Sequence, residues 1–446
     1  MPDSFLKVLV CFYILILPGV SSGQSADTAQ ILFSGNHQSI FQIRVMDNAA
    51  NNKASTGTGF ILSRDTAVQV TDADVEMSDT VFKVGKDLIA TNYHVIASAI
   101  DAPENYRVEV LLDNEMPTQA KIVNVDIVND LALLQIEKTG RKGLPIANIS
   151  PKKGDTVYSI GFPFDLGITV ISGTYNGLAP HSVNKRVHFS GSLNPGMSGG
   201  PAFNAKGEII GVNVSTAGNQ LSFLVPADSL SELVKSPPLD SIDELSDRLA
   251  EQLHGNGSRL LNQLMDGDWS TIPLGDAHAL GEVTEFLRCW GNSKNTDDET
   301  DKQPYFATRT CQTDHNIFIN NQLTTGKIEL QFYWLEAEAL NSPRFYSHYQ
   351  RVFRGYRPAN DGTEKDLASW VCEQDFVQLS NANEGLTKSV FCVRGYRKFT
   401  GLYDVFFLQG SVDRNHAAYM THFTMAGVPM DEILAFTGKF MGSALW

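Results

Sequence analysis

The sequence is poor in cysteine, in basic residues and in long apolar runs. It has only five cysteines in 446 residues, and none of them lies between Cys11 and Cys289. Lysine and arginine together number 35 against 50 aspartates and glutamates, so the formal net charge is −15. An acidic chain without a basic stripe is a poor partner for nucleic acid and for an anionic membrane surface. No apolar run reaches the roughly 20 residues that a membrane-spanning helix needs.

The rest of the composition is globular, and the N-terminus has a pattern of its own. Hydrophobic residues make up 42% of the chain, which excludes wholesale disorder, and the length predicts two or three domains. Lys7 is followed by an apolar run over residues 8–17 and then by small residues up to Gly23. This order is typical of a secretory signal peptide, so we expect residues 1–23 to be one and the protein to be secreted or periplasmic. An uncleaved membrane anchor is the alternative.

The other four cysteines lie in the second half of the chain, which predicts disulfides there. Four cysteines in an exported chain suggest two disulfides, for which three connectivities are possible. The short separations along the chain favour the local pairs Cys289–Cys311 and Cys372–Cys392. Neither pair has the spacing of zinc ligands, so we expect no metal and no other cofactor.

The chain divides near Pro237-Pro238 into two parts of different character. Before this point, short β-rich runs alternate with Gly and Asn turns, which favours an all-β barrel or sandwich over residues 24–236. After it, helical and strand-like patterns are mixed, so we expect residues 237–446 to be a separate α+β domain. Its first helix is indicated by a capping box, Ser241 with Glu244. An apolar stripe follows on that helix, made of Leu245, Leu249 and Leu253.

The strongest chemical signal is the segment from Asn194 to Pro201, which reads NPGMSGGP. Ser198 lies among three glycines, so the turn can expose its hydroxyl and let a substrate approach. The same turn can direct the backbone N–H groups of Gly196 and Ser198 at a developing oxyanion. Taken alone, the segment could also be a Gly-rich surface turn.

Two further segments gain meaning from their order along the chain. His94 ends a β-rich apolar run, and Asp130 opens a nearly continuous apolar strand. Alone, the first is typical of a packed histidine and the second of a strand-capping aspartate, because an unpartnered buried carboxylate is costly. The order His94, Asp130, Ser198 is the His–Asp–Ser order of the chymotrypsin-like double barrel.

With these motifs the sequence resembles the trypsin-like serine proteases, most closely the bacterial HtrA (Deg) type, over about residues 38–236. The matching stretches are 57–62, 88–96, 129–136, 154–164, 194–201 and 207–213. The resemblance implies a mainly β fold, a chymotrypsin-like double β-barrel. It also implies that Ser198 is the nucleophile, His94 the general base and Asp130 the residue that orients His94. Asp126 is the rival of Asp130 for the last role.

The sequence departs from the better-known family members at the nucleophile and in the primary pocket. Met197 stands where pancreatic-type proteases have an aspartate that pairs with a freed N-terminus, so we expect activity without such cleavage. By resemblance the pocket has no acid and should take a small or apolar side chain. Its expected lining is Ser192, Leu193, Val214, Ser215 and Thr216. The acidic stretch from Asp65 to Asp87 is longer than usual and could be a calcium site, but a solvated insertion is the simpler interpretation.

The resemblance implies a serine endopeptidase with a polypeptide substrate. Two alternatives stay open: a catalytically inactive protease fold that acts as a binding or chaperone-like module, and a hydrolase of small esters. Residues 237–446 show no carboxylate-binding loop of the kind that PDZ domains have, although HtrA proteins usually carry PDZ domains here. Substrate recognition, autoinhibition and stabilisation are all possible roles for this part, and the sequence does not predict an oligomeric state.

Overall fold

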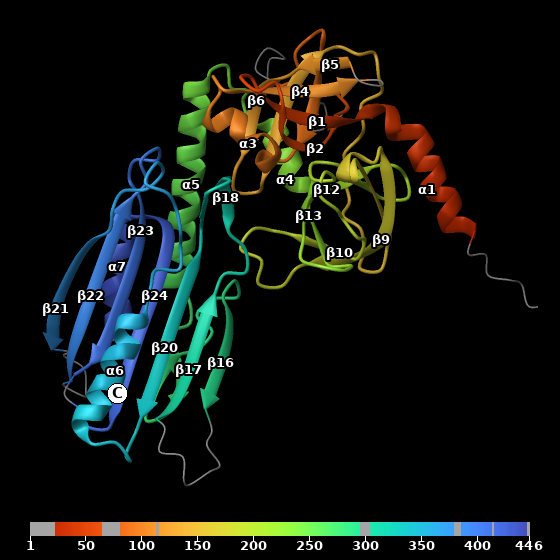
Figure 1. Cartoon of the computed structure of the whole chain (residues 1–446). Helices are drawn as coiled ribbons and strands as arrows, with labels where there is room; N and C mark the ends of the chain where they lie inside the picture. Colours follow the sequence, from red (N-terminus) through yellow and green to blue (C-terminus); the bar gives the residue numbers. More distant parts are fainter. Residues whose placement is uncertain are drawn as a thin grey trace, which may run out of the picture.

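The computed structural model describes residues 23–64, 81–112, 116–294, 304–378, 385–412 and 414–443, with side chains from residue 28 onward. Most of the predicted signal peptide and most of the acidic insertion lie outside these residues. The chain begins with helix α1 (Gly23–Asn36) and the short helix η1 (His37–Ser39). Figure 1 shows two strand-rich halves beside each other, with the long helix α5 (Ile242–Met265) running along both.

The first part of the chain forms a seven-stranded antiparallel sheet with the order β5-β4-β1-β2-β3-β7-β6. Apolar residues point to both faces of these strands and fill two cores, one shared with α3 and one shared with the barrel strands that follow. Helix α3 (Tyr93–Asp101) follows β3 directly and packs on the sheet. The strands are β1 (Ile40–Asp47), β2 (Lys53–Ile61), β3 (Lys86–Thr91), β4 (Tyr106–Leu112), β5 (Met116–Gln119), β6 (Lys121–Asp126) and β7 (Leu131–Glu137).

The next six strands close into a barrel with the order β10-β13-β12-β11-β8-β9. The short helix η3 (Pro163–Asp165) follows β8, and helix α4 (Ala227–Lys235) follows the last strand. The strands are β8 (Thr156–Gly161), β9 (Thr169–Leu178), β10 (Val187–Phe189), β11 (Pro201–Phe203), β12 (Ile209–Thr216) and β13 (Ser222–Pro226). The predicted mainly β, chymotrypsin-like class is confirmed, with the second barrel closed and the first a seven-stranded sheet that ends at β5 and β6.

The remaining chain is α+β, as expected. Its seven-stranded sheet has the order β16-β17-β20-β24-β23-β22-β21. Helices α6 (Ser342–Gly355) and α7 (Met430–Gly442) pack on it. The strands of this part are β14 (Thr271–Leu274), β15 (Ala277–Leu280), β16 (Arg288–Lys294), β17 (Tyr305–Gln312), β18 (Ile317–Asn320), β19 (Leu323–Thr325), β20 (Ile328–Glu336), β21 (Val371–Gln378), β22 (Leu386–Gly395), β23 (Leu402–Ser411) and β24 (Ala417–Pro429).

Both expected local disulfides are present, and each joins two neighbouring strands. Cys289 pairs with Cys311 between β16 and β17, and Cys372 pairs with Cys392 between β21 and β22. They therefore link each of the two edge strands of the C-terminal seven-stranded sheet, called the second sheet below, to its neighbouring strand.

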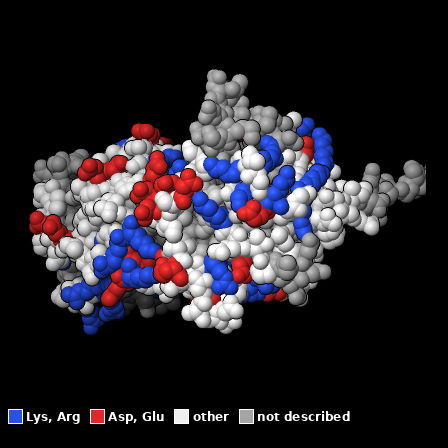
Figure 2. All heavy atoms as spheres, turned by 90° about the horizontal axis from the view of Figure 1, so that it is seen from above, with Lys and Arg blue, Asp and Glu red and all other residues white. Residues whose placement is uncertain are grey.

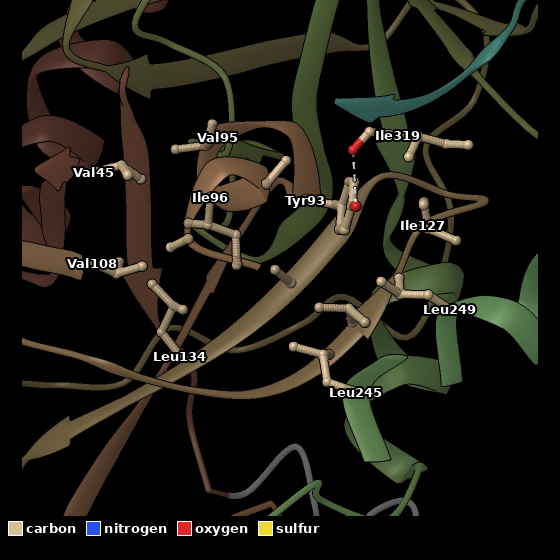
Figure 3. Packing of buried hydrophobic residues seen from close by; sticks show 14 of the residues in the cluster. Val45, Tyr93, Val95, Ile96, Val108, Ile127, Leu134, Leu245, Leu249 and Ile319 are labelled. Carbon is tan, nitrogen blue, oxygen red and sulfur yellow. Dashed lines mark hydrogen bonds between the residues drawn. The ribbon is translucent and has the colours of Figure 1, made fainter. Parts of the chain in front are cut away.

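The two parts share a hydrophobic core through α5, so they are less separate than the sequence suggests. Ser241 caps α5 by accepting a hydrogen bond from the backbone N–H of Glu244 at 3.2 Å, as the capping box predicts. The predicted leucine stripe on the first half of α5 packs into the core of the first sheet (Figure 3). Leu260, Leu261 and Leu264 on its second half pack into the core of the second sheet. The helix thus belongs to both cores.

Charges of both signs are interspersed on the face of the molecule seen from above. Figure 2 shows lysine and arginine beside aspartate and glutamate over this face, with no continuous stripe of one sign. Among the described helices, none is long and apolar enough to span a bilayer.

Candidate active site

The structure brings His94 and Asp130 into direct contact. His94 lies in the first turn of α3, and Asp130 lies in the turn that leads into β7. The ring Nδ1 of His94 is 2.6 Å from Oδ2 of Asp130, and the backbone N–H of His94 donates to Oδ1 at 2.8 Å. A carboxylate oxygen only accepts, so Nδ1 carries the proton and Nε2 is left as the basic nitrogen. Asp130 has a φ of 64°, a conformation that non-glycine residues seldom adopt outside constrained sites.

The rival carboxylate, Asp126, has other partners. It accepts hydrogen bonds from the backbone N–H and the side-chain amide of Asn129, at 2.9 and 2.7 Å. It therefore shapes the turn that presents Asp130. The amide of Asn92 holds the same turn from the other side by donating to the backbone carbonyl of Asp130 at 2.8 Å.

The electrostatic surroundings of His94 favour its charged form. Burial disfavours a charged ring, but the charge of Asp130 and the hydrogen bond to it outweigh that cost and raise the pKa of His94 above its ordinary value. The nearby guanidinium of Arg186 acts in the opposite direction. The Arg186 side chain is itself desolvated, which lowers its own pKa, while Asp130 and Asp126 counteract this.

Ser198 lies on a tight turn that only glycine allows at two positions. Gly196 has a φ of 97° and Gly199 a φ of 82°. A Cβ atom at Gly196 would overlap the carbonyl oxygen of Phe162, and one at Gly199 would overlap that of Thr58. These glycines therefore serve both the backbone conformation and the close packing of the turn.

The hydroxyl of Ser198 donates to the carbonyl of Val214 at 3.3 Å. Among the described residues, no hydrogen bond joins Ser198 to His94, and no backbone carbonyl accepts from the N–H groups of Gly196 or Ser198. By contrast, the N–H groups of Met197 and Gly199 are occupied by the carbonyls of Asn194 and Asn213. The donors expected to bind an oxyanion are thus the ones without a backbone acceptor.

Thr58 and Asn213 hold this turn in place, and the sequence motifs did not single them out for this role. The hydroxyl of Thr58 donates to the carbonyl of Gly196 at 2.7 Å, and its backbone N–H donates to the carbonyl of Ser198 at 2.7 Å. The buried amide of Asn213 donates to the carbonyl of Met197 at 3.2 Å. A polar residue within an apolar run of a strand is the signal that could have found Asn213, since buried polar groups require partners.

The residues expected to line the primary pocket differ in exposure, and one of them, Val214, accepts the hydrogen bond of the Ser198 hydroxyl. Ser192, Ser215 and Thr216 are exposed, whereas Leu193 and Val214 are 7% and 8% exposed. The side chain of Leu193 belongs to the core of the closed barrel. It is therefore a supporting core residue, and the exposed part of the expected lining consists of Ser192 and the end of β12.

Two residues of the C-terminal part reach the site, which sequence reasoning missed. The ring of Phe318 contacts that of His94 edge-on, with centroids 6.1 Å apart. The hydroxyl of Tyr93, next to His94, donates to the carbonyl of Ile319 at 3.0 Å. No sequence signal could have found contacts between residues so far apart in the chain. Within the described part of the chain, no group of three or more His, Cys, Asp or Glu side chains is placed to hold a metal ion.

Comparison with known proteins agrees with this geometry. The family model for trypsin-like peptidase domains matches residues 57–212. This segment is a trypsin-like peptidase domain of the HtrA type. The chain is 33% identical over 168 residues to the probable periplasmic serine endoprotease DegP-like of Brucella suis, and the match covers 34% of this chain and 31% of that protein.

Other proteins match over a similar share of this chain. Protease Do-like 1 of Arabidopsis thaliana is 29% identical over 198 residues, which cover 39% of this chain and 44% of the relative. The crystal structure of Deg5 is 26% identical and covers 47% of this chain and 93% of that chain, with a TM-score of 0.37. The chain thus spans less than half the length of these curated relatives.

Proposed function

We propose that this protein is a serine endopeptidase that hydrolyses peptide bonds through an acyl-enzyme on Ser198. The observation that carries the proposal is the two-point contact between His94 and Asp130, together with a glycine-rich turn that carries the half-buried Ser198. Relatives that are named serine endoproteases support the same chemistry for the trypsin-like domain.

In the proposed reaction, Oγ of Ser198 attacks the carbonyl carbon of the scissile bond while Nε2 of His94 takes its proton. The negative oxygen that forms is bound by the N–H groups of Gly196 and Ser198, which have no backbone acceptor among the described residues. The C–N bond then breaks, and the leaving amine takes the proton from His94. A water molecule, deprotonated by His94, attacks the ester carbonyl. The C–O bond to Ser198 then breaks, His94 returns the proton to Oγ of Ser198, and the acid is released.

Asp130 supports this cycle without changing its own protonation. It fixes the Nδ1–H tautomer of His94 by a hydrogen bond and stabilises the imidazolium that forms when Nε2 accepts the serine proton. The raised pKa of His94 is the equilibrium expression of this stabilisation. Arg186 moderates it, which keeps the ring neutral, and therefore basic, over a wider range of pH.

For the substrate we propose a polypeptide with a small or apolar side chain in the primary pocket. Ser192, Ser215 and Thr216 offer hydroxyl groups and no charge, so no group there would pair with a substrate lysine or arginine. We also propose that the protein acts in the periplasm or outside the cell. The two disulfides support an oxidising compartment, and the Brucella relative is named periplasmic. The division into residues 1–23, 24–236 and 237–446 stays a prediction.

A fluorophosphonate probe tests the nucleophile directly. We expect the full chain to be labelled and to cleave unfolded casein, and the Ser198→Ala variant to lose both. Ser236→Ala is the matched control, because Ser236 lies at the exposed end of α4. Casein cleavage at the wild-type rate by Ser198→Ala would overturn the proposal.

One observation favours the alternative of an inactive protease fold that binds polypeptides. The Ser198 hydroxyl donates to Val214, and no hydrogen bond to His94 is present among the described residues. Catalytic hydrogen bonds often tighten only when substrate binds. A wild-type chain that binds unfolded casein but takes up no probe would establish this second function. Comparing turnover of casein with that of a simple ester would distinguish a peptidase from an esterase.

A further inference from the structure

Strand β18 of the C-terminal part lies against the helix that carries His94. It forms a hairpin with β19, and the hairpin lies between the second sheet and the first part of the chain (Figure 1). Ile317 and Ile319 are 5% and 4% exposed and pack into the core of the first sheet, as does Leu323 of β19. The hydrogen bond from Tyr93 to the carbonyl of Ile319, drawn in Figure 3, fixes the strand to α3.

The side chains of β18 alternate in direction, and this sets the position of Phe318. Successive side chains of a β-strand face opposite sides, so Phe318 is less buried than Ile317 and Ile319, although its half-buried side chain also packs against the same core. Its ring meets that of His94 at an interplanar angle of 75°, an edge-to-face contact. Asp130 holds His94 from the Nδ1 side, and Phe318 contacts the same ring from a different element of the chain.

A second contact extends the same segment toward the substrate side of the site. His315, just before β18, packs edge-on against Phe223 with ring centroids 5.4 Å apart. Phe223 lies in β13 opposite Ser215 of β12, and Ser215 belongs to the exposed end of the expected pocket wall. The segment 315–318 therefore runs from the edge of the pocket wall to the ring of His94.

We propose that this segment completes the active site: Phe318 is a positioning residue for the His94 ring, and Phe318 with His315 forms an aromatic wall that restricts the size of the substrate side chain bound beside that ring. This inference rests on the proposed peptidase function and assigns part of its substrate selection to the C-terminal half. Asp130 fixes one edge of the imidazole, but rotation about the Cβ–Cγ bond tilts the ring while the hydrogen bond survives. An aromatic edge against the ring limits that tilt and excludes water from the same side.

The role of Phe318 is separable from a general effect on folding. Phe318 is only half-buried, whereas its neighbours Ile317 and Ile319 are buried and anchor the strand in the core. Removing the Phe318 ring therefore leaves the hairpin anchored by the isoleucines and by the Tyr93 hydrogen bond. Phe376 is a matched control, because it is a phenylalanine of the second sheet that is 60% exposed, on the edge strand β21.

The experiment compares the full wild-type chain with Phe318→Ala, Phe318→Leu, Phe318→Tyr, His315→Ala and Phe376→Ala. We expect Phe318→Ala and Phe318→Leu to lower kcat for a peptide substrate by roughly 10- to 100-fold, since misplacement of a reacting group has effects of this size. Phe318→Tyr keeps the aromatic edge and should retain most of the rate, and Phe376→Ala should match the wild type. Circular dichroism monitors folding, and if the alanine variant fails to fold, the leucine variant decides.

Cleavage-site mapping of casein by mass spectrometry tests the wall. Phe318→Ala and His315→Ala should accept bulkier side chains at one position next to the scissile bond, whereas the wild type and Phe376→Ala share one profile. A labelled wild type with unchanged kcat and an unchanged profile in the Phe318 and His315 variants overturns this inference and leaves the peptidase intact. A lower kcat with an unchanged profile supports the positioning role and overturns the wall. A wild type that takes up no fluorophosphonate overturns both the peptidase and this inference.

Discussion

Both oxygens of the Asp130 carboxylate contact His94, one at the ring Nδ1 and the other at the backbone N–H. The carboxylate thus fixes the imidazole and the start of α3 together. Asp130→Asn can keep the geometry, but its amide N–H cannot accept from Nδ1–H, and the ring is driven to the wrong tautomer. We expect kcat to fall by about 10⁴-fold, the scale seen for the equivalent change in other triads.

The control for this variant is Asp126→Asn. Asp126 bonds to Asn129 and makes no contact with His94 among the described interactions. We expect its kcat to stay within about fivefold of wild type, because weakening one hydrogen bond to Asn129 costs only about 1 kcal/mol. Equal losses of kcat in both variants, measured with the same peptide substrate, would contradict the orienting role assigned to Asp130.

The pH dependence of the reaction should report the raised pKa of His94. The ring acts as a base only when it is neutral, so the rate falls as pH drops through that pKa, and the inflection should lie above 6.5. Replacing Arg186 by Met removes a charge that lowers the pKa of His94, so the inflection should move to higher pH. Rates of fluorophosphonate labelling from pH 5 to pH 9 measure both. An inflection that moves down in the Arg186 variant would contradict the assigned electrostatics.

Gly196→Ala should abolish activity by disturbing the oxyanion donors. An alanine there would have to adopt a φ of 97° and would overlap the carbonyl of Phe162. We expect a loss of about 10²- to 10³-fold in kcat, the size of the effect when one oxyanion donor is lost. Gly154→Ala is the matched control, because Gly154 has a φ of 103° but nothing within 4 Å of a Cβ. It shares the backbone strain without the clash, so similar kcat values for the two variants would refute the role of the turn.

The motifs predicted the contact between His94 and Asp130, but they did not predict how the two parts of the chain pack together. His94, Asp130 and Ser198 each lie in a short motif that can be recognised without knowledge of the fold. Their order along the chain then indicated that the three residues act together. The leucine stripe of α5 predicted a buried face, but periodicity does not say what covers it. The covering surface is the first sheet, together with the β18–β19 hairpin. The contact between Tyr93 and Ile319 joins residues that no local pattern connects, so Phe318 could not be placed beside His94 from the sequence.

The shared core has a consequence for stability, which Leu249→Ala tests. Leu249 is 4% exposed, and it packs in the same core as Ile96 and Val108 (Figure 3). Its truncation should lower the free energy of unfolding by about 2–5 kcal/mol, as for other buried leucines. Because α5 also packs on the second sheet, both parts should lose stability in one transition, whereas two independent domains would unfold separately.

Urea unfolding followed by tryptophan fluorescence and by loss of probe labelling distinguishes these cases. Every tryptophan lies in the C-terminal part, after residue 268, and the probe site lies in the first part, so each signal reports one part. We expect both midpoints to move together in Leu249→Ala and neither to move in Leu434→Ala, since Leu434 on α7 is 51% exposed. If only the labelling midpoint moved, α5 would stabilise the trypsin-like domain alone. Removal of the second sheet would then leave a stable peptidase. If both move, the C-terminal part is required for the fold that holds His94, which is the condition for β18 to act on catalysis.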